Sequence, residues 1–312
     1  MEPDRWLGLE LRHLIALKAI AEHGTFGRAA RELGYTQSAI SQQIAMLERI
    51  VGQRLIDRPG GPRPVSLTEA GELLLRHADA IAARLQAAQA DLAALDAGES
   101  GPLRIGTYQS VGARILPALL REFTKDWPQI DISLRESADD QELALLVENG
   151  ELDLSFVVLP LLPGPYETAE LFRDPYVLVV PAGSPLAVRD RTPSLREIVD
   201  QPLISYRTCR TTHLVEGRLR QAGREPNIVF RSDENGTVQG LVAAGVGIGI
   251  MPRLAVDEAD EAIEVVELGD RVPPRLIGLA WHRDRRRTRA ADAFVALAKQ
   301  QTAAFDAAAV AA

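Results

Sequence analysis

The sequence predicts three parts: an N-terminal all-α winged helix-turn-helix, a long linker helix, and a C-terminal α/β domain with two lobes. Near the N-terminus, only Gly34-Tyr35 separates two short helical segments. Apolar residues then repeat in heptads over residues 74–95, and from Leu103 onward strand and helix patterns alternate. A chain of 312 residues is also too long for one typical domain.

The first signal is the helix pair. Thr25 is a good N-cap for a helix that continues to Leu33, and Gly34 can end it in the left-handed conformation. Thr36 caps a second helix to Leu47, and the tight turn between them is typical of a helix-turn-helix. The exposed side of the second helix carries uncharged side chains of the kind that read base edges in a major groove: Gln37, Ser38, Ser41 and Gln42. The alternative is an ordinary helical hairpin with a solvated polar face.

Around this pair, the pattern predicts a first helix over 11–22 and a β-hairpin wing. The strands of the wing are expected over 54–58 and 64–67, on either side of the turn 59–62. Arg58 and Arg63 lie where a wing could touch phosphates, although each could equally be a solvated loop charge.

A long helix is predicted next. Ser66 to Glu69 fits a capping box, and the helix continues to about Leu95. Apolar residues at alternating steps of four and three indicate pairing with a second helix: Leu74, Ala78, Ile81, Leu85, Ala88, Leu92 and Leu95. We expect Leu74, Ile81, Leu85 and Leu92 to line a contact between two copies of the chain. The alternative is a helix packed on its own domain.

The remaining residues alternate strands and helices, which indicates a parallel α/β sheet. Strands are expected over 103–106, 130–134, 152–159, 176–180, 203–206, 228–231, 247–251 and 276–281. Helices are expected over 111–124, 140–149, 194–199, 213–222, 235–244 and 288–301. The final strand and helix can return to the first half of the domain.

Ligands of such sheets bind beyond the carboxyl ends of the strands. The strand ends here are 106–110, 136–137, 206–208 and 233–237. Helix N-termini favour anions, and Arg207 and Arg210 could pair with a carboxylate, so a small anion is the expected ligand class. The alternative role for hydroxyls such as Ser110 and Thr237 is helix capping.

The sequence resembles the LysR-type transcriptional regulators. The matching text is LRHLIALKAIAEHGTFGRAARELGYTQSAISQQIAMLE from Leu11, then GQRLIDR, then VSLTEAG. Weaker similarity follows in GELDLSFVV, YVLVVPAGSPLA and VQGLVAAGVGIGIMP. Gln42 stands where a basic residue is frequent in the family, and Ser38 where proline is frequent. These departures concern base preference.

The resemblance implies a sequence-specific DNA-binding regulator whose DNA binding or bending a small-molecule effector modulates. It implies a DNA-binding domain over 1–67, a linker helix over 68–98 and a periplasmic-binding-protein-like effector domain over 101–312. Lobe I would be 101–173 with 276–312, and lobe II 174–275. Expected partners are double-stranded DNA, the effector, a second copy in a homodimer or a dimer-of-dimers tetramer, and RNA polymerase.

The expected contacts follow from these motifs. The residues expected to bind DNA are Thr25, Arg28, Thr36, Gln37, Ser38, Ser41, Gln42, Arg58 and Arg63. The residues expected to bind the effector are Thr107, Gln109, Ser110, Ser137, Tyr206, Arg207 and Thr208.

Composition restricts other functions. The net charge is −8, and residues 1–66 carry nine basic and seven acidic residues, so charge alone would not indicate nucleic acid. No P-loop, HExxH or CxxC is present, and the five histidines are scattered, so we expect no enzyme, cofactor or metal site. Cys209 lacks a partner cysteine and is interpreted as a passive thiol.

Two rival functions remain open. One is a receptor or enzyme built on a periplasmic-binding-protein fold, and the other is a DNA-binding protein whose second domain binds nothing. No apolar run reaches about 18 residues, and the N-terminus does not read as a signal peptide. We therefore expect a cytoplasmic protein with no membrane contact.

Overall fold

The computed structural model describes residues 5–57, 65–97, 101–187, 191–207 and 212–310. The chain divides into two compact units between residues 89 and 90, within one long helix. Each unit is described by itself.

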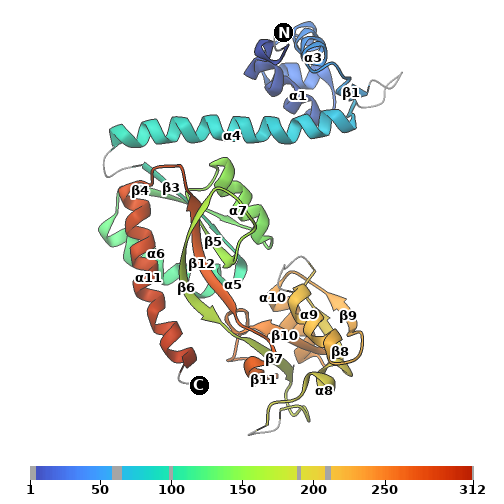
Figure 1. Ribbon diagram of the computed structural model, residues 1–312, viewed down its shortest axis with the longest axis vertical. Coiled ribbons are helices and arrows are strands. Elements are labelled where there is room, and N and C mark those ends of the chain that lie inside the picture. Colours follow the sequence, from blue (N-terminus) through green and yellow to red (C-terminus); the bar gives the residue numbers. More distant parts are fainter. Residues whose placement is uncertain (1–4, 58–64, 98–100, 188–190, 208–211, 311–312) are drawn as a thin grey trace. The chain divides into compact units, whose positions relative to one another are not determined.

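The N-terminal unit is a bundle of short helices around an apolar core (Figure 1). After a 3-10 turn, η1 (Arg5–Gly8), come α1 (Leu11–His23), α2 (Phe26–Glu32) and α3 (Gln37–Val51). The hydroxyl of Thr25 accepts the Arg28 N–H at the start of α2, and that of Thr36 accepts the Ala39 N–H at the start of α3. The sequence prediction of these helices and their N-caps is confirmed, except that α3 continues beyond Leu47 to Val51.

The wing and the long helix complete this unit. β1 (Ile56–Asp57) pairs antiparallel with β2 (Ser66–Leu67), so the strands are shorter than expected, and Arg58 and Arg63 lie outside the described residues. α4 (Glu69–Ala97) follows directly. The predicted capping box is wrong: Ser66 belongs to β2, and the Thr68 hydroxyl instead accepts the Gly71 N–H at 3.1 Å.

Gly71 is required by a close approach of the backbone. A Cβ at this position would lie 2.1 Å from the carbonyl oxygen of Leu55, so only glycine lets the first turn of α4 pack on the residue that precedes β1. On the other side of the wing, the Glu48 carboxylate accepts the N–H groups of Leu55 and Ile56. These contacts attach the wing to both α3 and α4.

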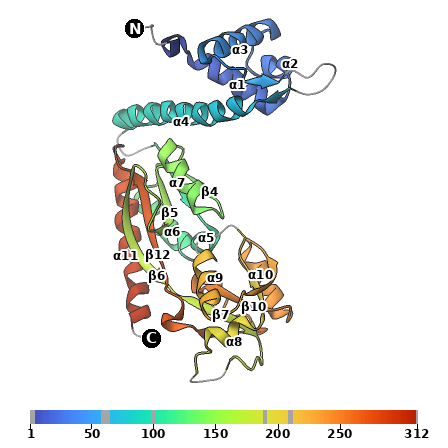
Figure 2. The ribbon, with the colours of Figure 1, turned by 45° about the vertical axis from the view of Figure 1, so that its right-hand side comes forward.

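The second unit holds two five-stranded sheets, one in each lobe (Figures 1 and 2). The first sheet has the order β4-β3-β5-β12-β6. Its strands are β3 (Gly101–Thr107), β4 (Ile130–Glu136), β5 (Leu154–Leu159), β6 (Tyr166–Asp174) and β12 (Arg275–His282). Its helices are α5 (Gln109–Arg114), α6 (Leu116–Asp126), α7 (Asp140–Asn149) and α11 (Arg289–Val310). α11 lies beside α6 along this lobe.

The second sheet has the order β11-β7-β10-β8-β9. Its strands are β7 (Tyr176–Pro181), β8 (Pro202–Ser205), β9 (Asn227–Arg231), β10 (Ile248–Pro252) and β11 (Ile263–Glu267). The helical segments of this lobe are α8 (Leu195–Val199), α9 (Thr212–Gln221), α10 (Asn235–Ala243), η2 (Arg253–Ala255) and η3 (Gly269–Arg271). The chain crosses between lobes from β6 to β7 and returns at β12.

Three details of the predicted α/β domain are wrong. The sheets are mixed, because β12 runs antiparallel to β5 and β6, and β7 runs antiparallel to β10 and β11. Strands β6 and β11 were not predicted. The single helix expected over 111–124 is two helices that meet at Ile115, with Pro117 in the first turn of the second. Proline has no N–H to continue a preceding helix and is tolerated in a first turn.

Within the part of the chain that the structure describes, no helix is both long and apolar enough to cross a bilayer.

Candidate nucleic-acid interface and ligand pocket

Helix α3 has one buried and one exposed face. Ile40, Ile44 and Leu47 are fully buried in the core of the N-terminal unit. On the other side Gln37, Ser38 and Gln42 are exposed, and Ser41 is half-buried. A helix held by its apolar face and presenting short polar groups has the form needed to lie in a DNA groove.

Three further described residues expected at DNA lie on α2 or at the starts of α2 and α3. Arg28 is exposed on α2, with a long side chain that can reach a phosphate. Thr25 and Thr36 are exposed, but their hydroxyls already accept hydrogen bonds at the starts of α2 and α3. Their role in the fold is therefore capping, and the Thr36 hydroxyl also shares a 3.0 Å hydrogen bond with the Ser38 hydroxyl.

The apolar seam predicted on α4 divides into two parts. Leu74 and Ala78 are buried in the core of the N-terminal unit, so the expectation that Leu74 lines a subunit contact is wrong. The first turns of α4 pack on the core to which α1 contributes. A 2.8 Å ion pair between Lys18 of α1 and Asp79 of α4 also links these two helices. Further along, Ile81, Leu85 and Leu92 are 44%, 49% and 66% exposed.

A cavity of about 180 Å³ lies between the two lobes of the second unit. Most of its lining lies at or just after the four expected strand ends, and Val158, Pro252 and Arg275 complete it. The full lining is Tyr108, Gln109, Ser110, Glu136, Ser137, Ala138, Asp140, Val158, Tyr206, Asp233, Glu234, Asn235, Pro252 and Arg275. The strand-end rule therefore predicted where the cavity is. Four of the seven expected effector residues line it, namely Gln109, Ser110, Ser137 and Tyr206.

The other three expected residues are placed differently. Thr107 is buried and is not in the lining, and its hydroxyl donates to the Tyr108 carbonyl. Arg207 is exposed and is not in the lining, since its guanidinium donates to the Arg231 carbonyl. Thr208 lies outside the described residues, as do Cys209 and Arg210.

Gln109 joins the two lobes across the cavity. Its side-chain nitrogen donates to the Glu234 carboxylate at 2.7 Å, and its side-chain oxygen accepts the Asn235 N–H at 2.8 Å. The Tyr206 hydroxyl donates to the Asn235 side chain in turn. A residue at the start of α5 is thus bound to the start of α10 in the other lobe.

A buried ion pair holds the two crossings between lobes together. The Arg275 guanidinium donates to the Asp174 carboxylate at 2.8 Å, and the two side chains are 6% and 3% exposed. Burial by itself would lower the pKa of Arg275, but the charge of Asp174 raises that pKa above its usual range. Arg275 also donates to the Ser110 hydroxyl at 2.8 Å.

The sequence prediction did not include this pair. Asp174 ends the strand that leaves the first lobe, and Arg275 begins the strand that returns to it. The opposite charges of these two residues, at the two predicted crossings between lobes, could have indicated an ion pair there. Asp174 and Arg275, at the two crossings, mark the hinge between the lobes. Because Ser110 contacts Arg275, a group that binds Ser110 lies directly beside this hinge.

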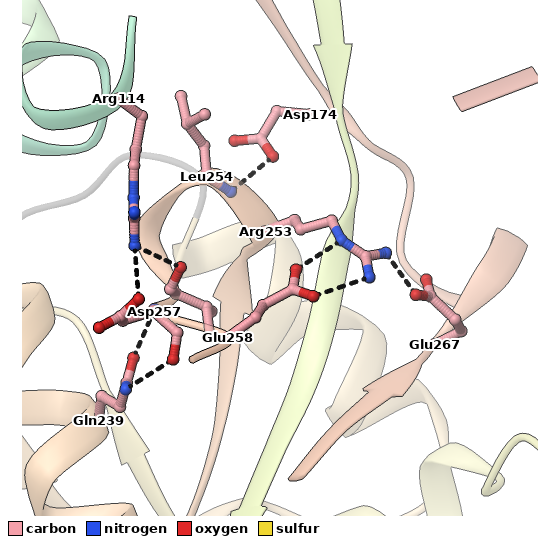
Figure 3. A network of polar contacts seen from close by, with 9 residues as sticks. Arg114, Asp174, Gln239, Arg253, Leu254, Asp257, Glu258 and Glu267 are labelled. Atoms are coloured by element: carbon pink, nitrogen blue, oxygen red, sulfur yellow. Dashed lines mark hydrogen bonds and ion pairs between the residues drawn. The ribbon is translucent and has the colours of Figure 1, made fainter. Parts of the chain in front are cut away.

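A second set of contacts reaches the same hinge from the far end of α5 (Figure 3). The Arg114 guanidinium donates to the Val256 carbonyl and to the Asp257 carboxylate, both at 3.1 Å. The Leu254 N–H donates to Asp174, next to Arg253. The short helix α5 therefore contacts the other lobe at both of its ends.

Below the Tyr206 strand end lies a buried carboxylate. Glu216 accepts hydrogen bonds from Ser205 and Arg231, and Arg231 also donates to the Tyr206 carbonyl. Burial alone would raise the pKa of Glu216, but the Arg231 and Ser205 hydrogen bonds and the nearby Arg220 hold that pKa below its ordinary value. This network fixes the backbone where β8 meets the cavity.

Comparison with known proteins agrees with the two-unit architecture. The family model for the bacterial regulatory helix-turn-helix protein, lysR family, matches residues 11–72, and that for the LysR substrate binding domain matches residues 96–303. The HTH-type transcriptional regulator AlsR of Bacillus subtilis is 36% identical over 79% of this chain and 82% of its own length. The uncharacterized HTH-type transcriptional regulator YnfL of Escherichia coli is 34% identical over 79% of this chain and 83% of its own.

Among solved structures, a full-length OxyR variant from Pseudomonas aeruginosa has the same fold. The TM-score is 0.64 at 24% identity, covering 93% of this chain and 95% of that one. The helix-turn-helix, the two lobes and these matches together give one conclusion: the chain belongs to the LysR family of DNA-binding transcriptional regulators with small-molecule effector domains.

Proposed function

We propose that α3 reads the operator and that a small molecule bound between the two lobes adjusts DNA binding. The observation that carries this proposal is the two-sided character of α3, with Ile40, Ile44 and Leu47 buried and Gln37, Ser38 and Gln42 exposed. The chain acts here as a regulator and not as a catalyst. Gln37, Ser41 and Gln42 contact base edges, and Arg28 contacts a phosphate.

Two copies of the chain pair through the exposed part of α4. Ile81, Leu85 and Leu92 lie at steps of four and seven along one helix, and burying them against a partner would remove apolar surface from water. A dimer presents two copies of α3, so the operator contains two half-sites one or more helical turns apart. Two such dimers can assemble into a tetramer, and the DNA-bound regulator can contact RNA polymerase. In this proposal residues 1–67 form the DNA-binding domain, residues 68–98 the linker helix and residues 101–312 the effector domain.

The effector binds in the cavity beside Ser110. One chain of contacts at the crossings between lobes joins Ser110 to Arg275 and Arg275 to Asp174. A ligand bound to Ser110 therefore changes its contacts when the lobes move. Only such a difference in affinity lets a ligand shift one arrangement toward another, and typical couplings are about 1–3 kcal/mol.

The test is DNA binding measured by fluorescence anisotropy, with the promoter next to the protein's own gene and with random DNA. Gln37→Ala and Ser41→Ala should each weaken promoter binding by about 1–3 kcal/mol and reduce the promoter-to-random ratio. Glu22→Ala, at an exposed position of α1, is the control and should keep that ratio. An unchanged ratio in both α3 variants would contradict the proposal.

A further inference from the structure

The charged side chains around the cavity are mostly acidic. Within its described lining, four carboxylates face one cation: Glu136 and Asp140 come from the first lobe, Asp233 and Glu234 from the second, and the cation is Arg275. Arg275 is ion-paired with Asp174, a residue outside the lining, so its charge is already balanced. A simple anion, which the helix N-termini led us to expect, would meet carboxylates from both sides.

The two carboxylates best placed for a ligand are Glu136 and Glu234. Glu136 lies over α5, because a Cβ on Gly112 would be 3.3 Å from its Oε2. Glu234 lies at the start of α10 in the opposite lobe, where Gln109 is its neutral hydrogen-bond donor at 2.7 Å. The two acids therefore approach the cavity from different lobes.

A metal ion does not fit this arrangement. Among the described residues, no group of three or more histidine, cysteine, aspartate or glutamate side chains could hold one. The carboxylates are spread around the cavity, and that spacing suits an organic cation whose charged nitrogen donates several hydrogen bonds. The cavity volume, about 180 Å³, is roughly six times the ~30 Å³ of one liquid water, which is room for a small organic molecule.

We infer that the effector carries a protonated amine, which Glu136 and Glu234 bind from the two lobes while Ser110 contacts its other end. This inference rests on the proposed function of the cavity as the effector site. A cation shared by carboxylates of both lobes is bound best when the lobes are closest, so the same charge that gives affinity also favours closure.

The experiment compares two chains of four methylenes with opposite ends, 1,4-diaminobutane and adipate, with lysine as the probe that carries both charges. Thermal unfolding of the full-length protein is followed with each at millimolar concentration, since a ligand of the folded state raises Tm. Diaminobutane, lysine or both should raise Tm, and adipate should not. A response to lysine alone identifies an amino acid, and a response to both identifies the amine itself as sufficient.

Charge variants then locate the site. Glu136→Gln and Glu234→Gln should each weaken the binding of the responding amine about tenfold, the usual loss of a hydrogen bond to a charged group. Glu151→Gln, an exposed carboxylate of the first lobe outside the lining, is the matched control and should bind as wild type does.

The outcomes separate the ligand class from the proposed function. Stabilisation by adipate alone, or no response to either amine, would overturn the amine assignment while promoter binding by the protein still stood. An amine response unchanged in both Glu→Gln variants would place the ligand elsewhere and overturn the cavity as well. Failure of the protein to bind its promoter would refute the DNA-reading proposal without bearing on the ligand.

Discussion

Gly71→Ala tests the packing of α4 on the wing, because the added methyl group has no space. The new Cβ would lie 2.1 Å from the Leu55 carbonyl oxygen and 3.3 Å from the Cβ of Leu67. The first contact is with backbone, so the wing or the helix must shift. Overpacking of this kind costs about 1–3 kcal/mol, and the severe overlap indicates the upper end of that range.

The same substitution also has a favourable part. Alanine is better than glycine in a helix by about 1 kcal/mol, so the net destabilisation of Gly71→Ala should be about 2 kcal/mol. Gly27→Ala is the matched control, in α2 of the same unit. Its Cβ would have Gln37 Oε1 as nearest atom at 3.6 Å, an ordinary contact, so the helix preference alone should stabilise by roughly 0.5–1 kcal/mol.

The assay is urea unfolding of the purified protein, followed by far-ultraviolet circular dichroism. The two variants should move the transition of the N-terminal unit in opposite directions, Gly71→Ala to lower urea and Gly27→Ala to slightly higher urea. If Gly71→Ala were as stable as wild type, the close approach between α4 and Leu55 would be wrong, and with it the position of the wing.

Three further outcomes are expected. Asp174→Ala leaves Arg275 as a buried charge without its carboxylate, and it should lower the free energy of unfolding by about 3–5 kcal/mol in urea titrations; wild-type stability would contradict the hinge pair. Leu85→Glu should convert the dimer to a folded monomer in sedimentation experiments, because Leu85 is 49% exposed and a charge there must be desolvated only on pairing. Glu216 has a lowered pKa in the folded state, so its stabilising contribution is complete above about pH 4.5 and is lost as the pH falls below it; Glu216→Gln should flatten that part of the acid dependence of Tm.

The local signals in the sequence were sufficient for the helices of the N-terminal unit. Thr25 and Thr36 are caps whose partners lie three residues away, and Gly34 has the left-handed conformation expected of it. The predicted parallel direction was wrong for the antiparallel pairs made by β7 and β12, since strand periodicity is the same for parallel and antiparallel pairing. The break at Ile115 was missed because Leu116-Pro117 can stand at the start of a helix as well as interrupt one.

The sequence predicted the strand-end residues of the cavity but not Arg275. In a two-lobed α/β domain the strand ends of both sheets line the space between the lobes, so Gln109 and Ser110 of the first lobe and Tyr206 of the second could be placed together from the sequence. The role of Arg275 could not be derived locally, because it contacts Asp174, 101 residues earlier, and Ser110, 165 residues earlier. The charge of the lining likewise depends on which side chains the fold brings together.

If the exposed face of α3 reads DNA sequence, substitutions on that face must lower specificity more than affinity. The most direct measurement is the ratio of promoter to random-DNA affinity for the wild type and for a Gln37→Ala, Ser41→Ala double variant, at one fixed salt concentration. We expect this ratio to fall at least about tenfold in the double variant while random-DNA affinity stays nearly constant. An equal loss on both DNAs, or no loss on either, would contradict it.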